Sequence, residues 1–535
     1  MENFDAIVIG GGPAGSTAAT LIARQGKSVV LIEKEYFPRH HIGESLLPAS
    51  LPILESLGVN EEIQSAGFLK KYGATMVWGT SPDPWSWYFA ETNRKYTHSY
   101  QVVRSTFDHI LLNNSIKSGV DVRQGHQVTK IHHREDYVSG VEIHTPDNKI
   151  IDLEAPITID ASGQSAILAR NMNLLEWDDF FQNLAVYGYF ENAEKLEAPD
   201  ENNIFIEAHP EGWNWLIPLH NGTVSVGVVV DSNIASKQLH SSDLEEFLCH
   251  YISYSSHISN LLGNATLTSP PQAVRDWSYA ANSFVGDGYI LVGDAACFID
   301  PLFSSGVHLA MNAGLLASAY VNTLFTDSTL ALESRVIYTK LYKQQYEHFR
   351  ELAKLFYSSN HTSDSYFWET RKLTPDAFDL PARTAFINAV AGQPAQGYER
   401  VVIEQGEAPS FIIDAIKNVE DTREQRKIKI DTSTEYFPDS IPKLAANVEL
   451  KNEPILENNE FVRSYVIYKE NRMVGYPVSN LIAASLPFIN GKASIASISQ
   501  EISNEYGIDA NTILPIIINA FKIMYIDGII ETFIL

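Results

Sequence analysis

The sequence is poor in cysteine, in positive charge and in long apolar runs, and each scarcity excludes a class of protein. Its 535 residues contain two cysteines, Cys249 and Cys297, in no metal-ligand spacing, so we expect no metal site and a reducing compartment, the cytoplasm. The 39 basic residues are outnumbered by 65 acidic ones, and the net charge of −26 argues against a nucleic-acid partner. No run of about 18 uncharged apolar residues occurs, so we expect no membrane-spanning helix. The apolar stretch at residues 6–9 follows Met1 too closely for a signal peptide, which again favours the cytoplasm.

What the sequence does contain is an apolar strand that runs directly into a glycine-rich turn. Residues 5–9 read Asp-Ala-Ile-Val-Ile, and residues 10–15 read Gly-Gly-Gly-Pro-Ala-Gly. Residues 16–24 continue as a helix, whose free N–H groups and positive dipole end can bind a pyrophosphate. Glu33 closes the next strand, residues 28–32, where an acid receives ribose hydroxyls. This combination predicts a dinucleotide-binding βαβ unit.

The length predicts two or three lobes, and hydrophobic periodicity predicts their elements. We expect a helical stretch that begins near Ser45 and covers residues 46–66. Further helices are expected after Arg104 and over residues 306–324, 330–357, 498–506 and 511–524. Alternation of apolar and polar residues predicts a β-meander over 120–160 that ends in Thr158–Asp160, and more strands over 184–231 and 449–474. Residues 289–294 read as a buried strand that ends in Gly-Asp.

Four separated segments point to one flavin: the glycine turn, Glu33, the turn after Asp160 and the Gly-Asp end at Asp294. Asp160 alone could equally form a turn, and Asp294 alone could cap a helix. Together and in this order, the segments resemble the glutathione-reductase-type FAD fold of aromatic hydroxylases and related oxidases, over about residues 1–330. The resemblance implies an α/β protein. Its parts are a Rossmann-like FAD-binding domain (1–75, 100–183 and 275–330) and an inserted antiparallel β-sheet substrate lobe (76–99 and 184–274). Beyond the resemblance we expect a helical region (331–389) and an additional α+β C-terminal region (390–535).

The resemblance also implies which residues hold the cofactor. In that fold the acid at Asp294 binds ribityl hydroxyls and the arginine at Arg104 contacts the flavin nucleotide. The expected FAD-binding residues are Gly10, Gly12, Pro13, Ala14, Gly15, Glu33, Lys34, Arg39, Ile42, Gly43, Glu44, Ser45, Arg104, Val128, Asp160, Gly163, Asp294, Pro301, Gly306 and Val307.

A narrower resemblance lies inside this fold. Residues 212–218, Gly-Trp-Asn-Trp-Leu-Ile-Pro, fit the GWxWxIP signature of flavin-dependent halogenases. Residues 39–48 and 300–308 are similar to two further segments of that family, and residues 67–79 resemble the segment with its active-site lysine. The family uses reduced FAD, dioxygen and chloride or bromide. No second dinucleotide fingerprint occurs, so we expect a separate flavin reductase as partner.

The halogenase motifs suggest roles for five positions. The resemblance places the halide at the backbone N–H groups of Ser305 and Gly306, and it makes Lys71 the residue that relays hypohalous acid to the substrate, either as an ammonium or as a haloamine. Lys70 is the rival lysine, and either one could be a solvated surface charge. Trp213 and Trp215 read as a barrier between flavin and substrate, although core packing would also explain them.

The substrate is expected to be an electron-rich aromatic ring. Family members that act on free tryptophan carry a glutamate where this chain has Phe303, which cannot remove a ring proton. The phenol and pyrrole branch is therefore favoured, with a tyrosine-like phenol first, either free or bound to a peptide or carrier protein. The alternatives are a flavin-dependent aromatic hydroxylase and a non-catalytic flavin-holding protein. The end of the chain weakly resembles a winged-helix or peptide-recognition module, which could equally form a lid or a dimer contact.

Overall fold

The computed structural model describes residues 2–78, 82–91, 93, 95–240, 242–358, 425–430, 437–469 and 475–534. The chain forms two compact units. The first contains the described residues up to Ser358 together with Asn458–Glu460, and the second contains the remaining described residues after 424. Most of the stretch 371–438, for which the sequence gives no clear pattern, lies outside the described residues.

The first unit is built on a six-stranded sheet that begins with the strand predicted at the N-terminus. Its order is β19 (Val285–Gly286), β20 (Tyr289–Leu291), β12 (Thr158–Asp160), β2 (Ala6–Ile9), β3 (Val29–Glu33) and β8 (Asp121–Gln124), and only β19 is antiparallel to its neighbour. β2 and β3 are buried along their whole length because both faces of a parallel sheet are covered.

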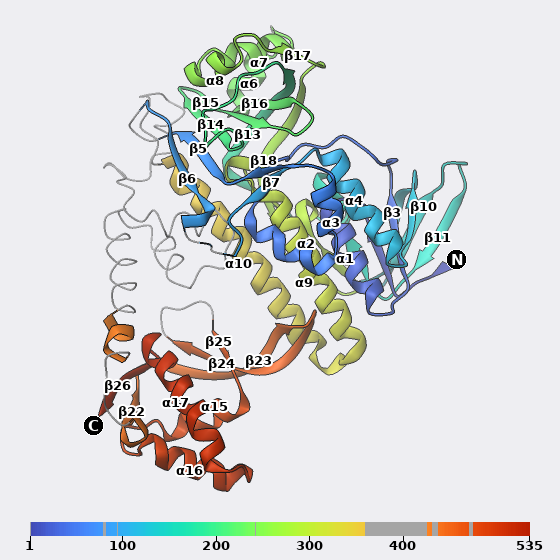
Figure 1. The fold of residues 1–535 in the computed structure, drawn as a ribbon. Coiled ribbons are helices and arrows are strands. Elements are labelled where there is room, and N and C mark those ends of the chain that lie inside the picture. Colours follow the sequence, from blue (N-terminus) through green and yellow to red (C-terminus); the bar gives the residue numbers. More distant parts are fainter. Residues whose placement is uncertain are drawn as a thin grey trace. The chain divides into compact units, whose positions relative to one another are not determined.

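Helices of the first unit pack beside this sheet (Figure 1). α1 (Pro13–Arg24) contacts both α4 (Arg104–Lys117) and α9 (Gly306–Thr326), and α10 (Ala331–Ser358) contacts α9. A Cβ on Gly314 would lie 2.5 Å from the backbone oxygen of Ala14, so this glycine sets the close approach of α9 to α1. The helices predicted over 306–324 and 330–357 are confirmed.

The β-meander predicted over 120–160 is wrong at both ends. At its start, residues 121–124 form β8 of the central sheet, in parallel with β3. β9 (Gln127–Arg134), β10 (Tyr137–His144) and β11 (Ile150–Glu154) are consecutive antiparallel strands, with β1 (Glu2–Asn3) added at the edge. Thr158–Asp160, however, is β12 of the central sheet, where it pairs in parallel with β2 and β20. The strand is fully buried, which is the environment of a central parallel strand and not of a meander edge.

A nine-stranded sheet forms the second layer of the first unit. Its path is β21 (Cys297–Phe298), β18 (Gln272–Ala281), β13 (Leu175–Glu191), β16 (Thr223–Asp231), β15 (Gly212–Pro218), β14 (Ile204–His209), β5 (Gly73–Val77) and β6 (Trp85–Tyr88), with β17 (Thr266–Leu267) beside β13. Three short helices, α6 (Ser232–Gln238), α7 (Leu244–Ile252) and α8 (Ser256–Leu261), cover its end (Figure 1). The tryptophan motif is strand β15, and all seven of its residues are buried.

The helix predicted to begin near Ser45 is wrong at its start. Residues 44–46 are extended, because Leu46 N–H donates to Tyr100 O (2.9 Å) and Val102 N–H donates to Glu44 O (2.8 Å). Helical structure begins only with the 3₁₀ turn Pro48–Ser50, and Gly58 in the left-handed region (φ +66°) then separates α2 (Leu51–Leu57) from α3 (Asn60–Ser65).

Next to this extended segment lies a two-stranded ribbon. β4 (Leu69–Lys71) pairs with β7 (Ser99–Gln101) in antiparallel fashion. β7 therefore has β4 on one edge and residues 44–46 on the other, and this arrangement positions Lys71.

The second unit combines small sheets and helices. β22 (Ile441–Leu444) pairs with β26 (Ile530–Ile534), and β23 (Val448–Glu457), β24 (Glu460–Lys469) and β25 (Tyr476–Val478) form a second sheet. Its helices are α15 (Asn480–Ser485), α16 (Ile495–Tyr506) and α17 (Ala510–Ile526), and their isoleucines share one core. α16 and α17 contain the two predicted helices, and α16 begins earlier because Ser494 caps it at Ser497 N–H.

Within the described part of the chain, no helix has the length and apolar content needed to span a bilayer.

Candidate flavin and oxidant site

The glycine turn is held too tightly for any larger residue. Gly10 adopts φ +105°, and a Cβ there would lie 2.3 Å from Ala161 O. A Cβ on Gly15 would lie 2.0 Å from Gly10 O. Gly12 is the N-cap of α1, so no side chain caps the helix, and its first N–H groups remain open to an anion. The turn thus has the geometry of a pyrophosphate site.

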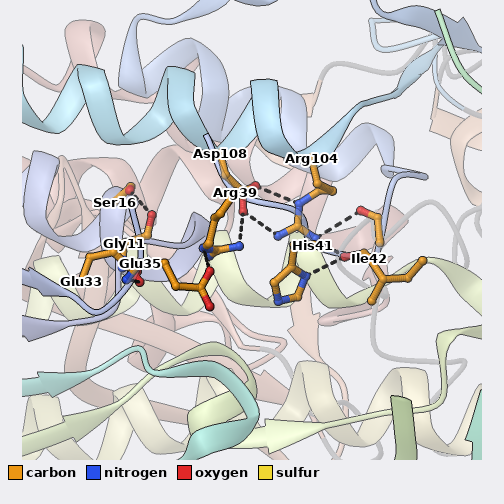
Figure 2. Close-up of polar contacts among 10 residues, drawn as sticks. Gly11, Ser16, Glu33, Glu35, Arg39, His41, Ile42, Arg104 and Asp108 are labelled. Carbon is orange, nitrogen blue, oxygen red and sulfur yellow. Dashed lines mark hydrogen bonds and ion pairs between the residues drawn. The ribbon is translucent and has the colours of Figure 1, made fainter. Parts of the chain in front are cut away.

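Glu33 lies directly beside this turn (Figure 2). Its carboxylate accepts the N–H of Gly11 (2.7 Å) and that of Glu35 (2.9 Å), which fixes both oxygens at the carboxyl end of β3. His126 N–H donates to Glu33 O (3.0 Å), and this contact brings Val128, two residues further along, into the same region. The structure therefore brings the predicted pyrophosphate and ribose residues together.

Two arginines share one buried carboxylate next to the nucleotide residues (Figure 2). Arg104 donates from Nε and Nη2 to Asp108 (2.8 and 3.0 Å) and from Nη1 to Ile42 O (2.5 Å). Arg39 Nη1 lies 3.5 Å from the same carboxylate, and Arg39 Nη2 lies 3.5 Å from the position of a Cβ on Gly12. Asp108 thus holds both arginines in place, Arg39 beside the glycine turn and Arg104 beside Ile42. It is absent from the predicted site, although its spacing of four residues from Arg104 is a visible helical signal.

The predicted acids Asp160 and Asp294 differ in their hydrogen-bond partners. Asp160 accepts N–H groups from Ser162 (3.0 Å) and Leu168 (2.7 Å), so it has the turn-forming role that its sequence position left open. The carboxylate of Asp294 makes no hydrogen bond among the described residues, and burial raises its pKa to about 6, opposed by Arg104. A half-buried carboxylate without a hydrogen-bond donor among the described residues suits a ligand hydroxyl, as expected for a ribityl chain.

The remaining predicted flavin residues lie around these groups. Lys34 and Gly306 are exposed. Ile42, Gly43, Gly163 and Pro301 are half-buried, and Pro13, Ala14, Glu44, Ser45 and Val307 are buried. Glu44 accepts a hydrogen bond from Tyr189 OH (2.6 Å), and burial raises the pKa of its carboxyl against the effect of that bond.

The predicted halide loop contains an uncapped helix start. Asp300 caps the 3₁₀ turn Pro301–Phe303 at Leu302 N–H (3.1 Å), and Ser304 then adopts the left-handed conformation. Ser305 is the N-cap of α9, yet its side chain makes no capping bond. The first N–H groups of this 21-residue helix therefore remain available to an anion. Phe303 is buried with its ring 5.0 Å from that of Phe356.

The two tryptophans of the motif lie on one face of β15. Their ring centroids are 6.0 Å apart, and Trp215 packs where Gly227 of β16 leaves room, since a Cβ there would lie 2.2 Å from the indole. Trp213 Nε1–H donates to Tyr357 OH (2.6 Å), and Tyr357 OH donates to Asp300 (2.6 Å). A buried chain of hydrogen bonds thus joins the motif to the start of the halide loop. No local pattern marks Tyr357, which is 144 residues away from Trp213.

Lys71 is buried, whereas its rival Lys70 is exposed. Lys71 Nζ donates to Ser45 Oγ (2.7 Å) and to Leu46 O (3.2 Å), and it lies 5.7 Å from the centre of the Phe89 ring. Burial lowers the pKa of this amine to about 7. Amine and ammonium forms therefore coexist near neutral pH. No hydrogen bond or ion pair within the described residues joins Lys71 to the tryptophans or to Ser305.

These residues fit FAD. The fold offers two helix starts without side-chain caps, an acid and an arginine pair beside the first of them, and the half-buried carboxylate of Asp294, which has no hydrogen-bond partner in the described part of the chain. These features define an FAD-binding α/β protein with a second, largely antiparallel sheet layer.

Comparison with known proteins specifies the class further. The chain matches the family described as tryptophan halogenase over residues 5–98 and 91–402. It is 35% identical to the tryptophan 2-halogenase of Chondromyces crocatus over 372 residues, which cover 69% of this chain and 70% of that protein. It is 31% identical to the 1H-pyrrole-2-carbonyl-[peptidyl-carrier protein] chlorinase of Pseudomonas fluorescens over 67% of this chain and 84% of that one. The solved structure of the myxobacterial chondrochloren halogenase CndH, an FAD-dependent halogenase, matches with a TM-score of 0.67 and 39% identity, covering 74% of this chain and 91% of that one.

The chain belongs to the tryptophan halogenase family. It is a flavin-dependent halogenase, an oxidoreductase that uses reduced FAD, a halide ion and dioxygen. The prediction of an enzyme is thereby confirmed, and the alternative of a non-catalytic flavin-holding protein is wrong.

Proposed function

We propose that this enzyme halogenates an electron-rich aromatic ring, a tyrosine-like phenol first and a pyrrole second, with Lys71 as the relay. The observation that supports this most strongly is the burial of Lys71 without a carboxylate partner among the described residues. A surface lysine would be solvated and charged. This amine is instead held dry, with a pKa of about 7, as a nucleophile needs at neutral pH.

The cofactor residues and the halide loop prepare the oxidant. Reduced FAD, when bound, would supply the two electrons and two protons with which dioxygen, a halide ion and one further proton become hypohalous acid and water. The uncapped start of α9 at Ser305 and Gly306 attracts the halide through its N–H groups and helix dipole. Chloride and bromide both suit such a site. A separate reductase would deliver the reduced FAD.

Lys71 then carries the halogen. Its neutral amine attacks the halogen of hypohalous acid, which forms an N–halogen bond and releases water. The ring attacks that halogen in turn and loses its proton, and the nitrogen takes up one proton, directly or through solvent, which restores the amine. Ser45 Oγ and Leu46 O each accept a hydrogen bond from Nζ and hold it in place. The protein therefore also sets the direction of the remaining position on this nitrogen, the one that attacks the halogen.

The tryptophans and Phe303 concern the substrate: how it is kept from the flavin, and which aromatic ring it contains. Trp213 and Trp215 form a rigid apolar wall, since one indole is packed on Gly227 and the other is bonded to Tyr357. Such a wall keeps the oxidant formed at the flavin from hydroxylating the substrate directly. Phe303 provides no carboxylate to accept a ring proton, so an activated phenol suits the site better than tryptophan. The substrate is either free or bound to a peptide or carrier, as in the pyrrole chlorinase relative.

The test is a turnover assay with a flavin reductase, NADH, FAD, bromide and a panel of phenols, pyrroles and indoles, with products read by mass spectrometry. We expect brominated phenols and no product when halide is omitted. Hydroxylated product that forms without halide would identify an aromatic hydroxylase. Bromination of indoles in preference to phenols would contradict the substrate class.

A further inference from the structure

The face of β7 that adjoins Lys71 contains two buried polar side chains with unmet hydrogen bonds. Lys71 pairs with Ser99 across the β4–β7 ribbon, and Leu69 pairs with Gln101. Paired residues of an antiparallel ribbon, and residues two apart on one strand, share a face. Lys71, Ser99 and Gln101 therefore share one face.

The side chain of Lys71 crosses this face. Ser45 forms a bridge with Gln101 on the far edge of β7, and Lys71 Nζ donates to Ser45 Oγ (2.7 Å). The side chain of Lys71 thus begins on β4, one neighbour of β7, and its amine ends beside Ser45 on the other neighbour. Ser99 and Gln101 project from β7, which lies between the two. Directly opposite Cβ atoms are about 5 Å apart in such ribbons, and diagonal ones are about 7–8 Å apart.

Both side chains are fully buried, and each has a polar atom without a hydrogen-bond partner among the described residues. Ser99 and Gln101 have no exposed surface. Gln101 Nε2 donates to Asn202 O (3.3 Å), which fixes the orientation of the amide and leaves Oε1 without a donor among the described residues. Ser99 Oγ likewise has no partner among them. Buried polar atoms are rarely left this way, so a hydrogen-bonding ligand is indicated beside the amine.

A hydroxyl group matches this pair. Gln101 Oε1 can accept one hydrogen bond, and Ser99 can donate one. A phenol oxygen both donates and accepts, whereas a pyrrole or indole N–H only donates. We propose that Ser99 and Gln101 form the specificity subsite for the acceptor ring and bind the phenol hydroxyl beside Lys71. This inference rests on the proposed phenol halogenation and assigns two residues to the choice of substrate.

The test uses N-acetyltyrosinamide and its O-methyl ether, which differ only in the donor hydrogen and a methyl group. Binding to the FAD-loaded enzyme is measured by equilibrium dialysis without halide, and halogenation is measured in parallel. We expect the parent to prefer the phenol, and Ser99→Ala and Gln101→Leu each to weaken phenol binding about fivefold to tenfold while ether binding is unchanged. FAD affinity and trapping of released hypohalous acid by monochlorodimedone should stay at parental values.

Tyr100→Phe is the matched control, because it removes a hydroxyl from the opposite face of the same strand and should leave phenol binding unchanged. Gln101→Met, which has a similar length and no strong acceptor, serves if Gln101→Leu does not fold, and it should also weaken phenol binding. Equal binding of phenol and ether by the parent, or unchanged discrimination in Ser99→Ala and the folded Gln101 variant, would show that the two residues are satisfied by ordered water only and would overturn the subsite. Absence of hypohalous acid from the parent would instead overturn the proposed function, and the binding assay would still report on the subsite.

Discussion

Replacing Lys71 with methionine should remove the relay and also make the protein more stable at low pH. The pKa of the amine falls from 10.5 to about 7 on folding because burial penalises the charged form. The unfolded chain therefore binds more protons than the folded chain between these values, and the unfolding free energy rises with pH. The penalty for burying the charge is about 5 kcal/mol at pH 6 and about 2 kcal/mol at pH 9, at 1.36 kcal/mol per pKa unit.

The loss of the Lys71 hydrogen bonds opposes this gain in stability. Methionine has similar volume but leaves Leu46 O without its donor, which costs about 1–3 kcal/mol. Lys71→Met should thus be about 2–4 kcal/mol more stable than the parent at pH 6 and close to it at pH 9.

Urea denaturation at saturating FAD, followed by flavin fluorescence at pH 6, 7.5 and 9, measures the difference. Lys70→Met is the control, since Lys70 is exposed and its replacement should leave the pH dependence of the parent intact. An equal pH dependence in parent and Lys71→Met would refute the claim that this amine is held dry and close to neutral.

Three further predictions follow from the same geometry. The rate of halogenation by the parent, with hypohalous acid supplied directly, should rise with pH through about 7 as the neutral amine of Lys71 accumulates, and a falling profile would show that the ammonium acts instead. Asp108→Asn should lower FAD affinity at least tenfold in a flavin-quenching titration, because it leaves Arg39 and Arg104 without their shared carboxylate; unchanged affinity would contradict this role. Tyr357→Phe breaks the bonds to Trp213 and Asp300 and should increase peroxide released per NADH consumed in a coupled assay, with FAD affinity unchanged; the parental ratio would exclude this positioning role.

Short-range signals explain why the flavin end of the site was predictable. The strand, the glycine turn and the acid at Glu33 lie within one βαβ unit, where backbone sterics restrict the residue types: at Gly15 a Cβ would meet Gly10 O at 2.0 Å. The tryptophan motif was also visible, because its Gly-Pro frame is unusual for core packing.

The surroundings of Lys71 could not be predicted in the same way. Lys71 was identified by resemblance, but its partners come from a segment 25–26 residues upstream and a strand 28 residues downstream, which no periodicity connects. The same pairing explains the wrong helix start. Leu46 and Leu47 favour a helix, yet Leu46 N–H donates to Tyr100 O, so tertiary pairing overrides local propensity there. Tyr357 and its bond to Trp213 depend likewise on packing between distant elements.

The central claim is that the oxidant made at the flavin reaches the ring only through Lys71. The most direct measurement compares Lys71→Ala with Lys70→Ala in the bromide assay, recording brominated N-acetyltyrosinamide and monochlorodimedone bromination in parallel. The account predicts that Lys70→Ala matches the parent, while Lys71→Ala still releases hypobromous acid and loses at least 100-fold in substrate bromination. Undiminished substrate bromination by Lys71→Ala would contradict it.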